Sequence, residues 1–139
     1  MNLYSNFVNV FWYNAFNFRG RARRKEYWFY MIVYSLILIA LSGLIEKMPS
    51  LFFAIVFVFC FPTLSLSIRR LHDIGRSGWW YLLSFTGAGG LLIFAWTLVD
   101  SEEGENEYGP DPKANERLYA NGREDDRKNG TSLRDLDER

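Results

Sequence analysis

The sequence predicts an all-α integral membrane protein: three transmembrane helices, preceded by an amphipathic interfacial helix and followed by a mobile polar C-terminal tail. Three long stretches without a charged residue, at 27–45, 51–68 and 79–99, are the main evidence, because a bilayer-spanning helix needs about 20 apolar residues. Charge is also sorted between these stretches. A chain of 139 residues has room for about one domain, so we expect a membrane domain over residues 1–112 and a polar tail over 113–139 that is disordered or marginally helical.

The sorting of charge predicts an orientation, although the formal net charge of the chain is zero. Residues 1–26 and 69–78 carry eight Lys and Arg against two acids, a net of +6, whereas residues 100–139 carry seven against thirteen, a net of −6. Cytoplasmic loops of membrane proteins are enriched in Lys and Arg. We therefore expect the N-terminus and the loop 69–78 to be cytoplasmic and, after three spans, the C-terminus to lie on the opposite side.

Residues 1–18 predict the interfacial helix. Their apolar side chains recur at spacings of three and four, which gives a helix an apolar stripe, but Asn and Ser interrupt the run. The segment is too short to cross a bilayer, so a helix lying in the interface is expected. A short helix packed on the spanning helices is an equal alternative.

The three spans differ in their internal signals. The first, 27–45, would reach about 28 Å, close to the hydrocarbon thickness. Pro62 should kink the second, and Thr63 and Ser67 could satisfy the freed carbonyls. Glycines lie in the middle of the third, 79–99, where they favour close helix packing or a break. A re-entrant hairpin, which would return the tail to the basic side, is the less favoured alternative.

Two basic segments flank the first and second spans. Five of the seven residues 19–25 are basic, and because they directly precede a span we expect them to meet anionic headgroups, each worth about 1 kcal/mol, rather than nucleic acid. The loop 69–78 holds three arginines and the only histidine. Charge inside hydrocarbon costs at least about 2.5 kcal/mol per residue, so this loop must lie at a membrane face or in a polar cavity.

Several short motifs together resemble a known family. They are 20–28 (GRARRKEYW), 69–73 (RRLHD), 76–80 (RSGWW), 104–106 (GEN) and 108–112 (YGPDP). In order and spacing they resemble the small bacterial inner-membrane proteins grouped as domain of unknown function family 805, over about residues 1–113. The resemblance implies a multi-pass protein of the bacterial inner (plasma) membrane, which would place the C-terminus in the periplasm. It implies no established activity, cofactor or catalytic residue. Acids at 102 and 103 stand where the family pattern has a Pro-Gly turn.

Enzymatic chemistry is not expected. The adjacent His72 and Asp73 occur together in metal-dependent phosphohydrolases, but such sites need further histidines, and this chain has none. A zinc site fails for the same reason, and the single Cys60 cannot build one. No phosphate-binding loop or dinucleotide fingerprint is present. We therefore expect no catalytic residue, no metal and no cofactor.

Two hypotheses account for the polar residues at the span ends. In the structural one, Asp73 accepts hydrogen bonds from Arg69, Arg70 or Arg76, and Glu26 meets Arg69 or Arg70. In the functional one, six side chains surround an anionic group, such as a lipid phosphate or an acidic segment of a partner, because the arginine fork can bond phosphate with two hydrogens. These six are Arg21, Arg24, Arg69, Arg70, His72 and Arg76.

The function expected from the sequence is therefore non-enzymatic. The leading hypothesis is an inner-membrane protein that organises anionic lipid or a protein partner through a cytoplasmic basic face. The alternative is a small channel or transporter subunit, which would need to form a homo-oligomer because three spans enclose little space. Transport is less favoured because no charge lies inside a span, where transporters usually carry one.

Overall fold

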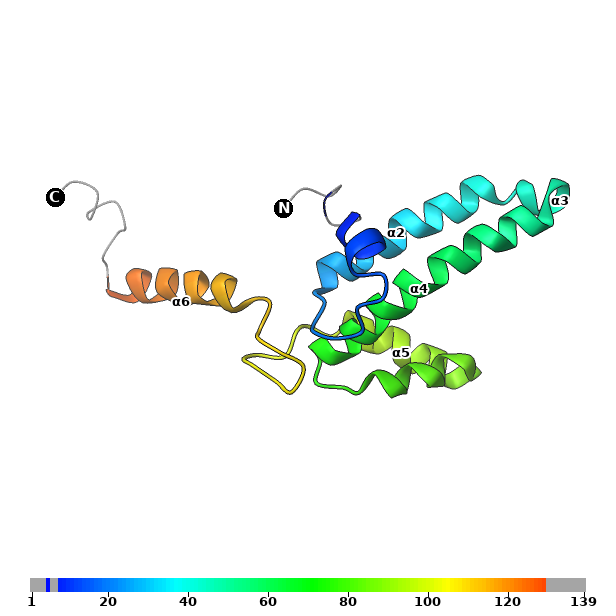
Figure 1. The fold of residues 1–139 in the computed structure, drawn as a ribbon. Helices are drawn as coiled ribbons and strands as arrows, with labels where there is room; N and C mark the ends of the chain where they lie inside the picture. The colour runs from blue at the N-terminus through cyan, green and yellow to red at the C-terminus, as the bar shows by residue number, and fades with distance from the viewer. Residues whose placement is uncertain (1–4, 6–7, 130–139) are drawn as a thin grey trace.

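The computed structural model describes residue 5 and residues 8–129, with side chains up to residue 124. All regular elements in this part of the chain are helical, as predicted (Figure 1). In chain order they are η1 (Asn9–Tyr13), α2 (Arg24–Leu41), α3 (Leu44–Lys47), α4 (Pro49–Asp73), η2 (Gly78–Phe85), α5 (Gly87–Leu98) and α6 (Ala114–Asn129).

The longest helix, α4, is the one helix of the described chain that is long and apolar enough to cross a membrane. Its 25 residues extend about 37 Å, more than the thickness of a hydrocarbon core. The helix continues through Pro62, and the hydroxyl of the next residue, Thr63, donates to the carbonyl of Phe59 at 2.7 Å. The predicted span 51–68 lies entirely within α4.

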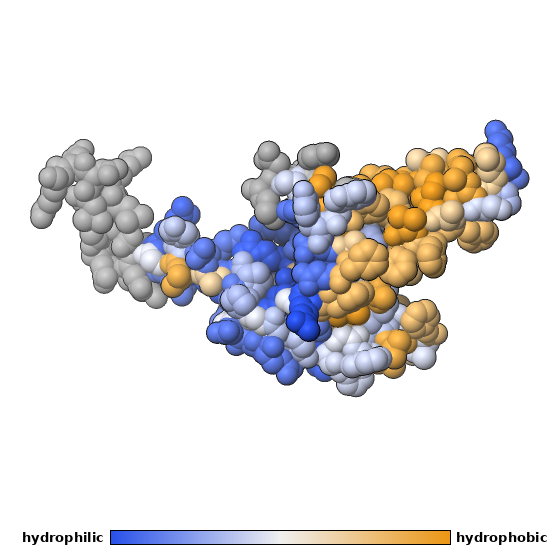
Figure 2. Space-filling model, viewed as in Figure 1, coloured by the Kyte–Doolittle hydropathy of each residue, from blue (hydrophilic) through white to orange (hydrophobic). Residues whose placement is uncertain are grey.

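Helix α2 lies beside α4 and runs in the opposite direction (Figure 1). Its first turn is charged, and its sequence is apolar from Tyr27 onward except for one serine. The predicted span 27–45 is divided between α2 and the short α3, and Pro49 at the first position of α4 suits the start of a helix. In the view of Figure 2, apolar side chains cover most of this helical hairpin, and hydrophilic residues lie at its far tip.

The prediction of one continuous helix over 79–99 is wrong. This stretch forms two short helices, η2 and α5, which fold back on each other as a hairpin (Figure 1). The eight residues of η2 are a 3₁₀-helix about 16 Å long, and the twelve residues of α5 reach about 18 Å. Neither helix is long enough to cross a bilayer.

Local side-chain chemistry explains the break. Thr86 is the N-cap of α5, because its hydroxyl accepts a hydrogen bond from the N–H of Gly89 at 3.2 Å. A Cβ at Gly89 would overlap the carbonyl oxygen of Leu83, so glycine is needed for the two arms to pack. At the other end of η2, a Cβ at Gly78 would lie 2.6 Å from the side chain of Ile68. Glycine at this position therefore allows the hairpin to pack closely against α4.

The hairpin returns the chain to the end of α4 from which it started. The N–H of Glu102 donates to the carbonyl of Asp73 at 2.9 Å. Residues 19–24, 69–78 and 97–113 thus meet at one end of the molecule, which we call the polar end, while α3 lies at the far end of the α2–α4 pair (Figure 1). The expectation that the chain after the third stretch emerges opposite the N-terminal basic segment is therefore wrong.

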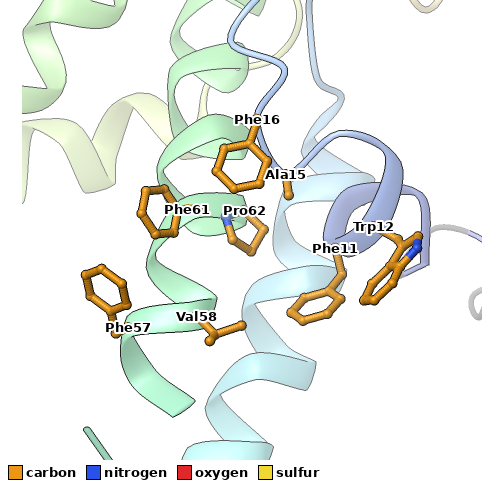
Figure 3. A pocket seen from close by; sticks show the side chains of 8 residues that line it. All are labelled: Phe11, Trp12, Ala15, Phe16, Phe57, Val58, Phe61 and Pro62. Carbon is orange, nitrogen blue, oxygen red and sulfur yellow. The ribbon is translucent and has the colours of Figure 1, made fainter. Parts of the chain in front are cut away.

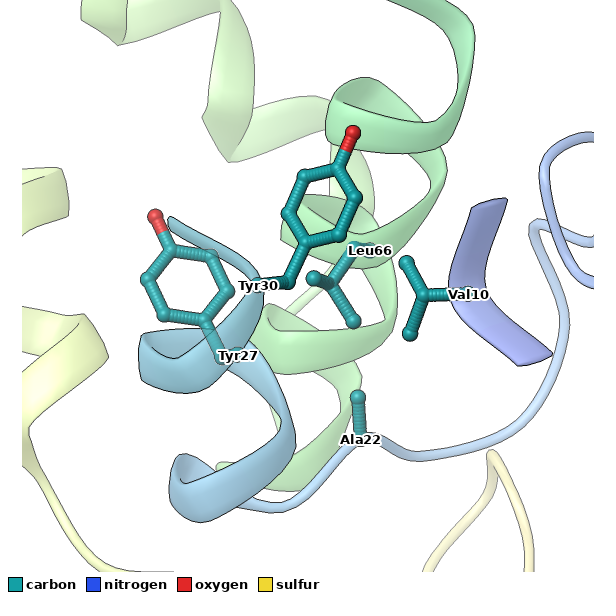
Figure 4. Packing of buried hydrophobic residues seen from close by; sticks show 5 residues of the cluster. All are labelled: Val10, Ala22, Tyr27, Tyr30 and Leu66. Atoms are coloured by element: carbon teal, nitrogen blue, oxygen red, sulfur yellow. The ribbon is translucent and has the colours of Figure 1, made fainter. Parts of the chain in front are cut away.

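A small apolar core joins the N-terminal segment to both long helices. It contains five buried side chains, Val10, Ala22, Tyr27, Tyr30 and Leu66 (Figure 4). Val10 of η1 packs in this core. Of the two alternatives for residues 1–18, this segment therefore matches the short helix packed on the long helices. Its neighbours Trp12 and Tyr13 are exposed. Residues 1–4 and 6–7 lie outside the described residues.

The tail begins as a helix, which is one of the two states expected for this polar segment. Helix α6 occupies Ala114–Asn129 and extends away from the rest of the described chain (Figure 1), while residues 130–139 lie outside the described part. Its first turn is tethered, since Glu116 pairs with Arg23 at 2.9 Å and Arg117 pairs with Asp111 at 2.6 Å. These ion pairs hold the start of a helix whose sequence is polar nearly all round.

The return of the chain makes a topological prediction. In a Cys60→Ser background, cysteines introduced by Arg19→Cys and Glu103→Cys should react with a membrane-impermeant maleimide from the same side of sealed vesicles. Lys47→Cys, at the far end of the helical hairpin, should react only from the other side. All three positions are exposed. Labelling of Glu103→Cys together with Lys47→Cys would contradict the hairpin.

Candidate functional site

The polar end is built around the carboxylate of Asp73, which is fully buried. It accepts hydrogen bonds from Arg21 Nε at 3.1 Å, from Arg70 Nη1 at 2.5 Å and from the hydroxyl of Ser101 at 2.5 Å. The side chains of both arginines are also buried, with 2% and 0% of their surfaces exposed. Three segments far apart in the sequence therefore meet on one carboxylate.

The guanidinium of Arg70 is bonded on all sides. Besides Asp73, it donates to the carbonyl oxygens of Thr97 at 3.3 Å, of Ala22 at 3.5 Å and of Val99. These carbonyls belong to the end of α5 and to the segment before α2. Arg70 thus joins α4, α2 and α5 in addition to neutralising Asp73.

Arg21 links the same carboxylate to the loop after α5. Its Nη1 donates to the carbonyls of Gly104 at 2.7 Å and Gly109 at 3.4 Å, and its Nη2 donates to those of Glu102 at 2.5 Å and Asp73 at 3.3 Å. Two buried arginines face one buried carboxylate, and these carbonyl dipoles offset the excess positive charge. The backbone carbonyls of the loop after α5 therefore point toward the guanidinium of Arg21.

His72 contacts residues of the loop after α5 and of the segment before α2. Its ring stacks on Tyr108, with centroids 3.9 Å apart and planes 5° from parallel, and its Nδ1 lies 3.3 Å from the carbonyl oxygen of Gly20. Asn106 donates to the backbone carbonyl of His72 at 3.0 Å. Within the described residues, no three His, Cys, Asp or Glu side chains lie close enough together to hold a metal ion.

The other predicted anion-binding residues are divided between different environments. Arg69 lies 3.6 Å from Glu26, and its buried Nε and Nη2 have no hydrogen-bond partner in the described chain. Arg24 donates to the carbonyl of Leu98 at 3.0 Å. Arg76 is exposed, and its guanidinium carbon lies 4.3 Å from the centre of the Trp96 ring.

The five arginines and the histidine of the functional hypothesis therefore gather at one end but do not surround one anion from outside. Asp73 is the internal anion, and of its three expected partners only Arg70 contacts it. Glu26 meets Arg69, one of its two expected partners. Sequence reasoning missed Ser101 and Asn106 as members of the site, although Asn106 lies in one of the short motifs. Their contacts form only when the hairpin returns.

A second electrostatic contact holds α6 to the polar end. Lys113 Nζ hydrogen-bonds Asp100, and this bond lowers the pKa of the Asp100 carboxyl to about 2. Arg117 Nη2 also donates to the carbonyl of Ser101 at 2.8 Å, directly beside the Asp73 cluster. The first turn of α6 is thus fastened to the same loop as Arg21.

Away from the polar end, an apolar groove of about 410 Å³ separates the N-terminal segment from the middle of α4 (Figure 3). The described side chains that line it are all apolar: Phe11, Trp12, Ala15, Phe16, Phe57, Val58, Phe61 and Pro62. None of these eight side chains carries a charge or a group that could act in catalysis. The lining of this groove is apolar, like the surface of the α2–α4 helical hairpin beside it.

Neutralising the central carboxylate should strongly destabilise the protein. Asp73→Asn would leave Arg21 and Arg70 buried without a counter-ion, and breaking a buried ion pair in this way typically costs about 3–5 kcal/mol. Denaturation of the purified protein in detergent would measure the loss. Asp100→Asn is the control, because that side chain is half exposed and surface pairs contribute about 1 kcal/mol or less. Equal losses for the two variants would contradict a central role for Asp73.

Two adjacent arginines should differ in their effect on stability. Arg70→Met should cost about 3–5 kcal/mol because Asp73 loses its closest partner. Arg69→Met should cost about 1 kcal/mol or less, since it removes two buried N–H groups that lack partners. Burial raises the pKa of Glu26 and Arg69 opposes the shift, so loss of Arg69 should raise this pKa further. The same denaturation experiment tests the order, and a larger loss for Arg69→Met would refute it.

Comparison with known proteins places the chain in a family. Residues 15–110 match the family described as a protein of unknown function (DUF805). The matched residues include Asp73, both of its arginine partners and Ser101. No solved structure matches the chain.

Two proteins of Escherichia coli (strain K12) are similar over most of their length. The chain is 38% identical to inner membrane protein YhaH over 113 residues, covering 72% of this chain and 90% of YhaH. It is 39% identical to inner membrane protein YhaI over 106 residues, covering 72% of this chain and 89% of YhaI. The uncharacterized protein YiiR of the same strain is 32% identical over 89 residues, covering 60% of this chain and 54% of YiiR. Together these matches show that the chain belongs to the DUF805 family, which the sequence motifs predicted and which includes inner-membrane proteins.

Proposed function

We propose that this protein is a non-enzymatic inner-membrane protein that holds anionic phospholipid at its polar end, on the cytoplasmic side. One observation carries the proposal. Three cationic side chains at this end, Arg19, Lys25 and Arg76, are exposed and have no ion-pair partner among the described residues. Cations beside a membrane attract anionic headgroups, each contributing about 1 kcal/mol.

Aromatic side chains accompany these cations. Phe18 precedes Arg19, Trp96 lies under Arg76, and Trp79, which is 80% exposed, follows shortly after Arg76. Aromatic rings concentrate at the level of the headgroups in membrane proteins. This combination supports a polar end that sits at the membrane surface with its free cations among the headgroups.

The proposed topology has two crossings. Helix α4 crosses the bilayer, the apolar residues 27–45 of α2 and α3 cross beside it in the opposite direction, and the η2–α5 hairpin enters partway and leaves on the same side. Both basic segments then lie on one face, and the positive-inside rule makes that face cytoplasmic. Residues 100–117 share the face, so α6 is cytoplasmic rather than periplasmic. Their acidic side chains have little weight in this rule.

The structural contacts of the titratable groups support a non-enzymatic role. Asp73, Arg21, Arg70 and His72 all form bonds that hold helices together. His72 lines a cavity of about 490 Å³, but most of the side chains around it are apolar, such as Leu64, Ile68 and Trp79. The cationic side chains that remain available to bind an external anion are therefore those at the surface.

Stability in defined bilayers tests the proposal. In nanodiscs, replacing phosphatidylcholine by phosphatidylglycerol should raise the thermal midpoint of the wild type, because a ligand that binds only the folded state stabilises it. Arg19→Gln, Lys25→Gln and Arg76→Gln combined should remove most of this increase. Lys47→Gln with Arg123→Gln, which removes exposed charges elsewhere, should preserve it.

Other outcomes would point to other functions. An unchanged midpoint in phosphatidylglycerol would refute lipid binding and would leave a protein partner as the ligand of the basic face. Ion flux across proteoliposomes above the protein-free background would instead favour an oligomeric channel subunit.

A further inference from the structure

We propose that Arg24 and Lys25, with Trp28 and Leu98, form a specific site for the phosphate headgroup of one membrane phospholipid. These four residues line a surface cavity of about 480 Å³ between the start of α2 and the end of α5. The inference rests on the proposed function and assigns the lipid binding to the residues of this cavity. It concerns a single retained lipid, whereas Arg19 and Arg76 act on the surrounding bilayer.

The walls of the cavity are held in place by contacts with α5. Arg24 Nη1 donates to the carbonyl of Leu98 at 3.0 Å, and the indole N–H of Trp28 donates to the carbonyl of Thr97 at 3.3 Å. The Trp28 ring also meets the Phe94 ring edge-on, with centroids 5.7 Å apart. The side chains therefore need little further ordering when a ligand binds, which favours affinity.

The charge around the cavity favours an anion. Arg24 lies 3.4 Å from Asp100, but Asp100 also bonds Lys113, so one carboxylate serves two cations. Lys25 is exposed and has no ion-pair partner in the described chain. Counting these three cations against Asp100 leaves a net charge of +2, as suits a phosphate. Glu26, in the same turn of α2, pairs instead with Arg69.

The apolar surface beside the cations favours a lipid over free phosphate. On α2, Ile32 lies one turn beyond Trp28 and is 56% exposed. On α5, Phe94 lies one turn before Leu98 and is 54% exposed. Apolar side chains therefore continue from both walls of the cavity toward the apolar part of the molecule, where the acyl chains of a bound phospholipid would lie.

Native mass spectrometry of the protein purified in a neutral detergent tests the site. The wild type should retain one phosphatidylglycerol molecule, and Arg24→Gln with Lys25→Gln should weaken this binding about thirty-fold, as expected for two cations near a headgroup. Arg19→Gln with Arg76→Gln removes the same number of charges elsewhere at the polar end and should change the affinity less than about threefold. Inorganic phosphate should not displace the lipid.

The remaining outcomes separate the alternatives. Equal weakening of binding by both double variants would overturn the site but leave general lipid attraction intact. Failure of the wild type to retain phosphatidylglycerol, together with an unchanged thermal midpoint in nanodiscs, would overturn the proposed function as well. Displacement by inorganic phosphate would overturn the lipid as ligand. If Arg24→Gln fails to fold, Lys25→Gln alone serves, because this side chain has no ion pair within the described residues, and it should still weaken binding about fivefold.

Discussion

A single buried carboxylate, Asp73, constrains the arrangement of the whole polar end. Removing charged groups from water costs several kcal/mol for each ion, and this cost is offset only when the partners and hydrogen bonds are nearly complete. Arg21, Arg70 and Ser101 supply these partners from three separate segments. The segments must converge for any of the three charges to be tolerated, so the network acts as one cooperative unit.

The η2–α5 hairpin is what allows this convergence. A straight third span would carry Ser101 and the loop after it to the far end of α4, and Arg21 would lose the carbonyls of Gly104 and Gly109. The hairpin instead places the end of α5 beside the first turn of α2. The result is an asymmetric molecule, with two long apolar helices extending from one polar end (Figure 2).

This arrangement separates two kinds of basic residue that look alike in the sequence. Arg21 and Arg70 are buried and hold the fold together, whereas Lys25 and Arg76 remain at the surface beside aromatic rings. Only the second kind can bind an external anion without breaking the contacts that stabilise the fold. Any role of the polar end in binding lipid therefore depends on the cations that the Asp73 network does not use.

The sequence by itself determined the class of the protein. Apolar runs of helical length predict long membrane helices, and α4 matches one of them because an uninterrupted apolar run permits few other structures. The family motifs also identified the segments that form the polar end. The convergence of basic segments 19–25 and 69–78 followed from their positions at the ends of two antiparallel helices.

Only the tertiary structure decided the path of residues 79–99 and the partners of the charges. The glycines of this stretch are compatible with a continuous span as well as with a break, and the choice depends on whether Gly78 and Gly89 must pack against Ile68 and Leu83. Likewise, the preference of Asp73 for Arg21 over Arg69 or Arg76 cannot be read from spacing. It arises because a buried charge takes the partner that the folded backbone brings within hydrogen-bond distance.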